Sequence, residues 1–199
     1  SVWHARRARV ILQERAAKGT IVQEARNRLF DIYQKESNVD LRLRGFWALH
    51  VTGQLTESDL LTALNDSEEY IRGWAIQFLG EDREISPKAI QQLEALSQDK
   101  SPIVRLYMAA VLQRIPINER WNISTALTSN TQDKDDHNIP KMIWFGLEPT
   151  IATDIERALD LGINSNIPVI AEYIARRVIN EDGIEQLIAA SQKSSPNQI

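Results

Sequence analysis

One pattern recurs along this chain and restricts the fold more than any other feature of the sequence. It reads RGFWALHVTG from Arg44, RGWAIQFLG from Arg72 and RLYMAAVLQR from Arg105. At positions +2, +3, +6 and +7 from each arginine the residues are apolar or aromatic, with one histidine, and this spacing is typical of one helix face. One helical hairpin cannot bury such a face alone, so the recurrence predicts repeated helical units that pack against one another.

The alignment assigns structural roles to residues that would otherwise suggest a catalytic site. His50 falls where Phe78 and Val111 stand in the other copies, so we expect a packed, hydrogen-bonded imidazole at a core position. Gly45 follows Arg44 inside the helix, where glycine costs about 1 kcal/mol relative to alanine. A close approach between two helices would offset this cost, and we prefer this interpretation to a ligand at the backbone.

The rest of the chain also has helical patterning. Thr56 with Asp59 forms a capping-box pattern, Ser86 precedes Pro87 at a helix start, and Gly53 stands where a helix would stop. No window of four to eight residues alternates cleanly between apolar and polar residues, as a half-buried strand would. The sequence therefore predicts an all-α chain of about eleven helices.

The expected domain organisation is simple. We expect a single repeat domain over residues 1–193, made of about five helix pairs, and a frayed tail over 194–199. The chain opens at Ser1 without an initiator methionine or a signal-peptide pattern, which favours a fragment of a longer protein. No apolar run approaches the roughly 18 residues needed to span a bilayer, so we expect no membrane insertion of this segment.

Charge is distributed unevenly along the sequence. Residues 1–50 hold ten Lys/Arg and five Asp/Glu, or +5, which leaves 13 against 22, or −9, for residues 51–199. A basic segment can attract an acidic partner or nucleic acid, although solvated helix faces have the same composition. Large aromatic residues and arginines dominate interaction surfaces, and the residues expected at such a surface are Trp3, Arg6, Arg7 and Trp144.

The Asp, Val/Ile–Arg and small-residue pattern resembles HEAT repeats over most of the chain. This resemblance implies an all-α, HEAT-like α-α superhelix, a right-handed solenoid of helical hairpins. It also implies a structural ladder in which Asp and Arg side chains of neighbouring units pair. The residues that match this ladder are Asp66, Arg72, Asp99, Arg105 and Arg44. An Asp stands six residues before the arginine in two copies but only four before Arg44, so the first unit departs from the pattern.

A narrower resemblance concerns three segments, WALHVTG, VRLYMAAVLQR and NIPKMIWFGLEP. They look like part of large bacterial proteins of a membrane-bound dehydrogenase type, in which HEAT-like helices follow a β-propeller and often precede a c-type cytochrome domain. The resemblance implies an extracytoplasmic, periplasmic scaffold that corresponds to the helical segment alone. It assigns no catalytic residue to this chain.

No motif for catalysis, a cofactor or a metal is recognisable. Zero cysteines exclude thiolate metal sites and a cysteine nucleophile, and G-x-S-x-G, H-E-x-x-H and phosphate-binding glycine loops are absent. The loop TQDKDDHN, residues 131–138, is rich in oxygen ligands but lacks the glycine and terminal glutamate of an EF-hand. A cation site there remains an alternative to acids that complement a helix N-terminus. We expect no catalytic residue, no cofactor and no small-molecule ligand.

Two functions from different classes follow. The first is a non-catalytic α-solenoid scaffold that docks another protein or a neighbouring domain of the same chain. The alternative is a HEAT-like nucleic-acid binder or DNA glycosylase that uses the basic N-terminal quarter, since some HEAT-like proteins are DNA glycosylases. An overall pI of about 5.5 weighs against the alternative.

Overall fold

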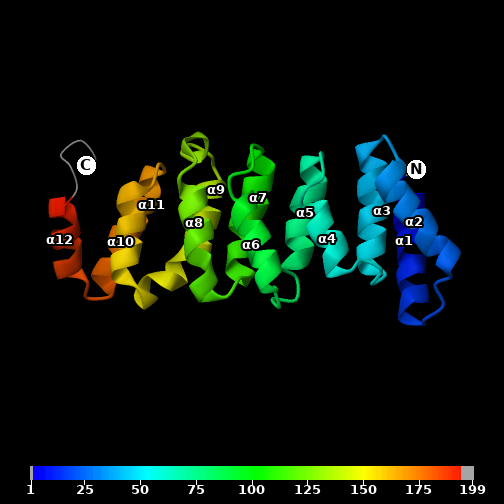
Figure 1. The fold of residues 1–199 in the computed structure, drawn as a ribbon, viewed down its shortest axis with the longest axis horizontal. Coiled ribbons are helices and arrows are strands. Elements are labelled where there is room, and N and C mark those ends of the chain that lie inside the picture. The colour runs from blue at the N-terminus through cyan, green and yellow to red at the C-terminus, as the bar shows by residue number, and fades with distance from the viewer. Residues whose placement is uncertain (1, 194–199) are drawn as a thin grey trace. The chain divides into compact units, whose positions relative to one another are not determined.

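The computed structural model describes residues 2–193, and every regular element in that range is a helix. Twelve α-helices and four short 3-10 helices form, and no strand occurs within residues 2–193 (Figure 1). The predicted all-α class is confirmed. Ser1 and the predicted frayed tail, residues 194–199, lie outside the described residues. Within them, no helix combines the length and apolar character that a membrane span requires.

The α-helices, in chain order, are α1 (Val2–Ala17), α2 (Gln23–Lys35), α3 (Val39–Val51), α4 (Glu57–Ala63), α5 (Glu69–Leu79), α6 (Pro87–Leu96), α7 (Pro102–Val111), α8 (Arg120–Thr128), α9 (Ile139–Leu147), α10 (Ile155–Asn164), α11 (Pro168–Asn180) and α12 (Ile184–Lys193). The 3-10 helices are η1 (Leu112–Arg114), η2 (Ile117–Glu119), η3 (Thr131–Asp133) and η4 (Glu148–Thr153). The chain divides into two compact units, residues 1–78 (unit 1) and 79–199 (unit 2). The prediction of a single repeat domain over residues 1–193 stays a prediction.

Local signals in the sequence place the helix ends. In the capping box that opens α4, the Asp59 amide donates to Thr56 Oγ1 at 3.2 Å and the Thr56 amide donates to Asp59 Oδ2 at 2.8 Å. Ser86 accepts a hydrogen bond from the third residue of α6, which begins with a proline. Gly53, at φ +67°, takes the left-handed conformation after α3. These predicted start and stop signals are confirmed.

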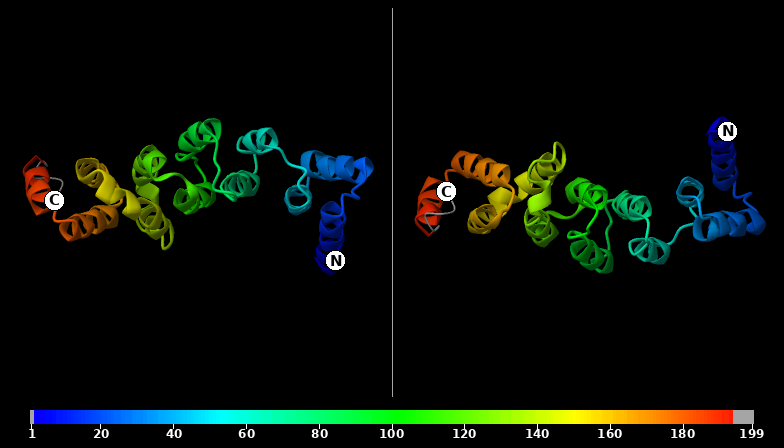
Figure 2. Two further views of the ribbon diagram at one scale, coloured as in Figure 1. Left: turned by 90° about the horizontal axis from the view of Figure 1, so that it is seen from below. Right: turned by 90° about the horizontal axis from the view of Figure 1, so that it is seen from above.

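Aromatic side chains hold α2, α3 and α5 together in unit 1. Phe46 is fully buried, and its ring centre lies 4.8 Å from that of Tyr33 and 5.4 Å from that of Phe78. Trp47 and Trp74 meet edge to face at 5.2 Å. In Figure 2, α3 is seen end-on whereas α2 lies across the view, so the two helices cross rather than run parallel.

The helices of unit 2 pack in two layers. The first helices of successive hairpins, α6 and α8, contact each other, and the second helices contact in the order α7, α9, α11. Within the hairpins, α6 contacts α7, α8 contacts α9, and α10 contacts α11. In Figure 1 these helices stand side by side. Each helix therefore buries its apolar stripe against both its own hairpin partner and the neighbouring hairpin.

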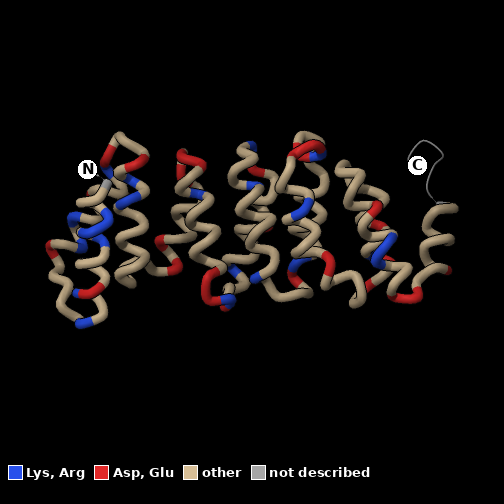
Figure 3. Tube along the Cα trace, turned by 180° about the vertical axis from the view of Figure 1, so that it is seen from behind, with Lys and Arg blue, Asp and Glu red and all other residues tan. Residues whose placement is uncertain are grey.

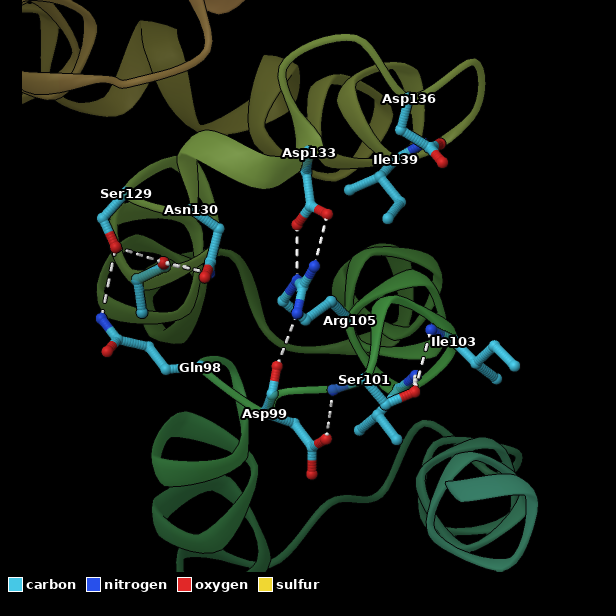
Figure 4. A network of polar contacts seen from close by, with 12 residues as sticks. Gln98, Asp99, Ser101, Ile103, Arg105, Ser129, Asn130, Asp133, Asp136 and Ile139 are labelled. Atoms are coloured by element: carbon cyan, nitrogen blue, oxygen red, sulfur yellow. Dashed lines mark hydrogen bonds and ion pairs between the residues drawn. The ribbon is translucent and has the colours of Figure 1, made fainter. Parts of the chain in front are cut away.

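Arg105 and Asp133 form a buried ion pair at the centre of unit 2 (Figure 4). Arg105 Nε and Nη2 donate to the two carboxylate oxygens of Asp133, each at 2.6 Å, and both side chains are 2% exposed. Arg105 Nη1 donates to the backbone carbonyl of Asp99 at 2.7 Å. The hydrogen bonds to Asp133 raise the pKa of Arg105 above its ordinary value although burial opposes this. A bidentate pair of this kind fixes both position and orientation.

The other predicted ladder residues lie near the starts of their helices. Arg72 Nη1 donates to the backbone carbonyls of Asp66 and Ser67 at 2.8 and 3.1 Å. Asp66 accepts from the Glu68 amide through Oδ1 at 2.9 Å and from Arg42 Nη2 through Oδ2 at 2.5 Å. The carboxylate of Asp66 therefore accepts a backbone amide just ahead of α5 and receives an arginine from α3.

The arginine of α3 that reaches Asp66 is Arg42, not Arg44. Counted from the start of each helix, Arg42, Arg72 and Arg105 are all the fourth residue. Arg44 lies two residues, or about 200°, further around the helix, so it points away from Asp66. In the sequence, a glycine follows both Arg44 and Arg72, so aligning on this pair places Arg44 opposite Arg72. In the structure Arg42 is the residue of α3 that corresponds to Arg72, two positions earlier.

The corrected register also explains His50. This side chain is half-buried rather than part of the core, and its ring stacks on Phe78 with centres 3.6 Å apart and planes 6° apart. With Arg42 as the reference, Ala48 and Leu49 take the buried positions that the alignment gave to His50 and Val51. The prediction that His50 occupies a core position is therefore wrong.

Asp66 binds both an arginine and a backbone amide, whereas in loop 131–138 two separate acids make these two kinds of contact. Asp133 receives Arg105, while Asp136 Oδ1 accepts the amides of Asn138 and Ile139, both at 2.8 Å. These backbone hydrogen bonds lower the pKa of Asp136 below its ordinary value. The fourth residue of α9 is Met142, so α9 has no arginine at the position that Arg105 occupies in α7.

Arg120 links α8 to α9 and pairs with no acid among residues 2–193. It is buried, and its guanidinium donates to the backbone carbonyls of Ile115 and Gly146 at 2.8 Å and of Gln113 at 3.3 Å. Burial lowers the pKa of Arg120. These carbonyls lie at or just beyond the C-terminal ends of η1 and α9, where the helix dipole is negative and favours a cation.

Replacing Asp133 with asparagine should lower the free energy of unfolding by about 3–5 kcal/mol, because Arg105 would remain buried without a counter-charge. Urea unfolding followed by circular dichroism measures this change. Asp135→Asn is the matched control, since its carboxylate is 88% exposed in the same loop, and it should shift the free energy by less than about 0.5 kcal/mol. Equal effects of the two variants would contradict the role of the buried pair.

Asp136→Asn keeps an oxygen acceptor but removes the charge. Because the folded-state pKa of Asp136 is lowered from 3.8, its contribution is present above about pH 4 and is lost as the pH falls through the folded-state pKa. At neutral pH the variant should be less stable by about 0.3–1 kcal/mol. In urea titrations the difference from the parent chain should disappear once the pH falls below the folded-state pKa. A difference that persists in acid would contradict this prediction.

Candidate binding groove of unit 1

A groove of about 380 Å³ opens between α1, α2 and α3. Its floor is apolar: Leu12 comes from α1, Leu29 and Ile32 come from α2, and Ala48 comes from α3. Leu41, at the start of α3, also lines the groove and is 40% exposed. The groove thus leaves several aliphatic side chains of three helices without full cover.

Gly45 fixes the distance between α2 and α3 beneath this floor. A Cβ atom at Gly45 would lie 3.0 Å from Ile32 Cγ2, 3.0 Å from the Tyr33 amide nitrogen and 3.2 Å from the Leu29 carbonyl oxygen. The last two are backbone atoms and cannot move without a shift of α2. The expected close approach of helices at this glycine is confirmed.

Three arginines surround the apolar floor. Arg6 and Arg9 lie one helical turn apart on α1, and Arg44 faces them from α3. None of the three forms an ion pair or a hydrogen bond with any residue in the described range 2–193. No Asp or Glu lines the groove. Figure 3 shows the concentration of basic residues along this end of the chain.

Trp47 forms part of the groove wall. The guanidinium carbon of Arg9 lies 6.0 Å from the centre of its ring, within the range of a cation–π contact. Its indole Nε1 is buried, and no acceptor reaches it within residues 2–193. Buried donors are nearly always paired in proteins, so this nitrogen is a donor in need of an acceptor.

The residues that the sequence predicted at an interaction surface occur in both units. Arg6 lines the groove, whereas Arg7 and Trp3 are exposed elsewhere on α1, with the Trp3 ring edge-on to His4. Trp144 belongs to unit 2, where its half-buried ring lies 5.3 Å from that of Tyr173. An interaction surface at these residues stays a prediction.

Sequence reasoning missed Arg9 and Arg44 as groove residues. A signal was present, because Ala5, Ala8 and Leu12 lie on one face of α1 with Arg6 and Arg9 beside them. The role of Arg44 was hidden by its assignment to the ladder.

Loop 131–138 offers no arrangement for a cation. Asp133 binds Arg105 and Asp136 binds backbone amides, as described above. Across the part of the chain that the structure describes, no group of three or more His, Asp or Glu side chains is placed to hold a metal ion.

In comparisons with known proteins, no family model, no curated protein and no solved structure matches this chain. The resemblances to HEAT repeats and to the helical segment of dehydrogenase-type proteins stay predictions.

Gly45→Ala should destabilise unit 1 by about 1–3 kcal/mol, because the added methyl group forces α2 away from α3. This outweighs the gain in helix propensity of about 1 kcal/mol. Gly162→Ala in α10 is the control. A Cβ atom at Gly162 would lie 3.4 Å from its nearest neighbour, the side-chain atom Ile174 Cδ1, which is an ordinary van der Waals distance. Urea unfolding should show Gly162→Ala to be neutral or stabilising, and a stabilising Gly45→Ala would refute the close packing.

Proposed function

We propose that this chain is a non-catalytic helical-repeat docking module whose unit 1 groove binds a short segment of another protein or of a neighbouring domain. The observation that carries the proposal is the set of three arginines, around an open apolar floor, that form no ion pair among residues 2–193. Charged groups without a counter-charge in this range and incompletely covered apolar groups are available to a partner.

The chemistry of the lining favours recognition over catalysis. Its side chains are aliphatic, indole or guanidinium groups. At neutral pH a guanidinium group stays protonated, and the aliphatic groups carry no exchangeable proton. The groove therefore supplies apolar area, positive charge and hydrogen-bond donors, which are the ingredients of a binding surface.

Stacked hairpins are the architecture we propose for the module, in the form of a HEAT-like, right-handed solenoid. Two features support this proposal: the two-layer order of contacts in unit 2, and the arginine at the fourth position of α3, α5 and α7. The resemblance to dehydrogenase-type proteins adds the proposal that the module serves a larger extracytoplasmic protein and docks one of its own domains.

The alternative function is nucleic-acid binding through the basic N-terminal quarter. Its support is the +5 charge of residues 1–50. Residues 1–78 as a whole hold eleven Lys/Arg and ten Asp/Glu, or +1, so unit 1 lacks the broad basic face that a phosphate backbone requires. A docked protein segment is therefore the proposal that unit 1 supports better.

Selection of peptides from a phage-displayed library on the immobilised chain tests the docking function. Selected peptides should lose at least about tenfold in affinity for Ala8→Trp, which fills the groove from α1, because the bulky ring occupies their site. Ala17→Trp is the matched control, since Ala17 is exposed at the end of the same helix and does not line the groove. If no peptide distinguishes the two variants, the groove is not the docking site.

A further inference from the structure

The unit 1 groove carries a more specific inference about its occupant, and this inference rests on the docking function proposed above. The groove volume of about 380 Å³ is near the lower end of the range of about 300–1,000 Å³ found for small-ligand clefts. It accommodates a few side chains of an extended or helical segment. It does not accommodate a folded domain or a nucleic-acid duplex.

The positive charges around the groove favour an occupant with negative charge. Arg6, Arg9 and Arg44 have no acidic partner among residues 2–193. Elsewhere the chain neutralises arginines that line pockets. In the pocket beside Trp144, Arg177 Nε lies 2.6 Å from Glu148 Oε1, and Arg177 Nη1 lies 2.5 Å from Glu181 Oε1. The three arginines of unit 1 are therefore unlike those of the pocket in unit 2.

Guanidinium groups bind carboxylates through two parallel hydrogen bonds, so an occupant with carboxylates fits this rim. The two sides of the groove set the spacing: Arg6 and Arg9 lie on α1, and Arg44 lies on α3. Between them the floor of Leu12, Leu29 and Ile32 requires an apolar side chain. The rim and floor together select acidic residues on either side of an apolar one.

From these observations we propose that the groove binds an acidic, amphipathic peptide segment, in which carboxylates pair with Arg6, Arg9 and Arg44 and an apolar side chain enters between them. The segment belongs to a partner protein. A second copy of this chain and nucleic acid are the competing occupants.

Fluorescence anisotropy with labelled hexapeptides tests the proposal on the whole chain. The probe alternates glutamate and leucine, and the comparison peptides replace every glutamate with glutamine or with lysine. The glutamate peptide should bind at least about tenfold more tightly than the glutamine peptide, because it alone pairs with the guanidinium groups. The lysine peptide should not bind. Affinity for the glutamate peptide should fall as salt is raised.

Arg6→Gln and Arg7→Gln form a matched pair on adjacent residues of α1. Arg6 lines the groove, and Arg7 is exposed outside it. Arg6→Gln and Arg44→Gln should each weaken binding of the glutamate peptide by about three- to tenfold, whereas Arg7→Gln should change it less than about twofold.

The outcomes separate this inference from the docking function on which it rests. If Ala8→Trp abolishes binding of phage-selected peptides but the glutamine peptide binds as well as the glutamate peptide, docking stands and the acidic occupant is refuted. Equal losses in Arg6→Gln and Arg7→Gln, together with tight binding of a twelve-nucleotide oligo(dT), would replace it with nucleic acid. Self-association in sedimentation that Ala8→Trp abolishes would replace it with a second copy. Absence of binding at about 1 mM glutamate peptide would also overturn it.

Discussion

The bidentate ion pair between Arg105 and Asp133 is the interaction on which the arrangement of unit 2 depends. Both groups are almost completely excluded from water, so each requires the other at hydrogen-bonding distance. The pair holds η3 against α7, and Asp136 caps α9 three residues further along. A single buried contact therefore determines where the next hairpin layer begins.

The chain uses arginine differently wherever this pairing stops. Helix α9 has Met142 at the position of Arg105, and Arg120 instead ties the neighbouring segments together through backbone carbonyls. The guanidinium group tolerates this environment because it presents several donors in one plane and stays charged under ordinary conditions. Although α9 lacks the arginine, hydrogen bonds from Arg120 still connect α8 with α9 and with the segment after η1.

Arginines of unit 1 occur in two different environments. Arg42 and Arg44 are two residues apart on α3, yet Arg42 pairs with Asp66 and Arg44 borders the groove. The two arginines differ because an acid, Asp66, lies on the segment that faces Arg42. The ion pair with Asp66 makes Arg42 part of the internal packing of unit 1. The arginines without such a carboxylate among residues 2–193 border the groove that, in our proposal, a partner with carboxylates fills.

The sequence by itself determined the helical class and the capping at Thr56 and Ser86, because these depend on residues near in the chain. A glycine inside a helix also predicted a close helix approach at Gly45, but only the structure identified α2 as the facing helix. Only the tertiary structure decided that Arg42 is the arginine of α3 that binds Asp66 and that Asp133 is the partner of Arg105, 28 residues away. Local composition after Arg44 and Arg72 is alike, and a pairing between distant residues leaves no local pattern. The groove, too, could not be predicted from the sequence, because its lining residues come from α1, α2 and α3, which meet only when the helices pack.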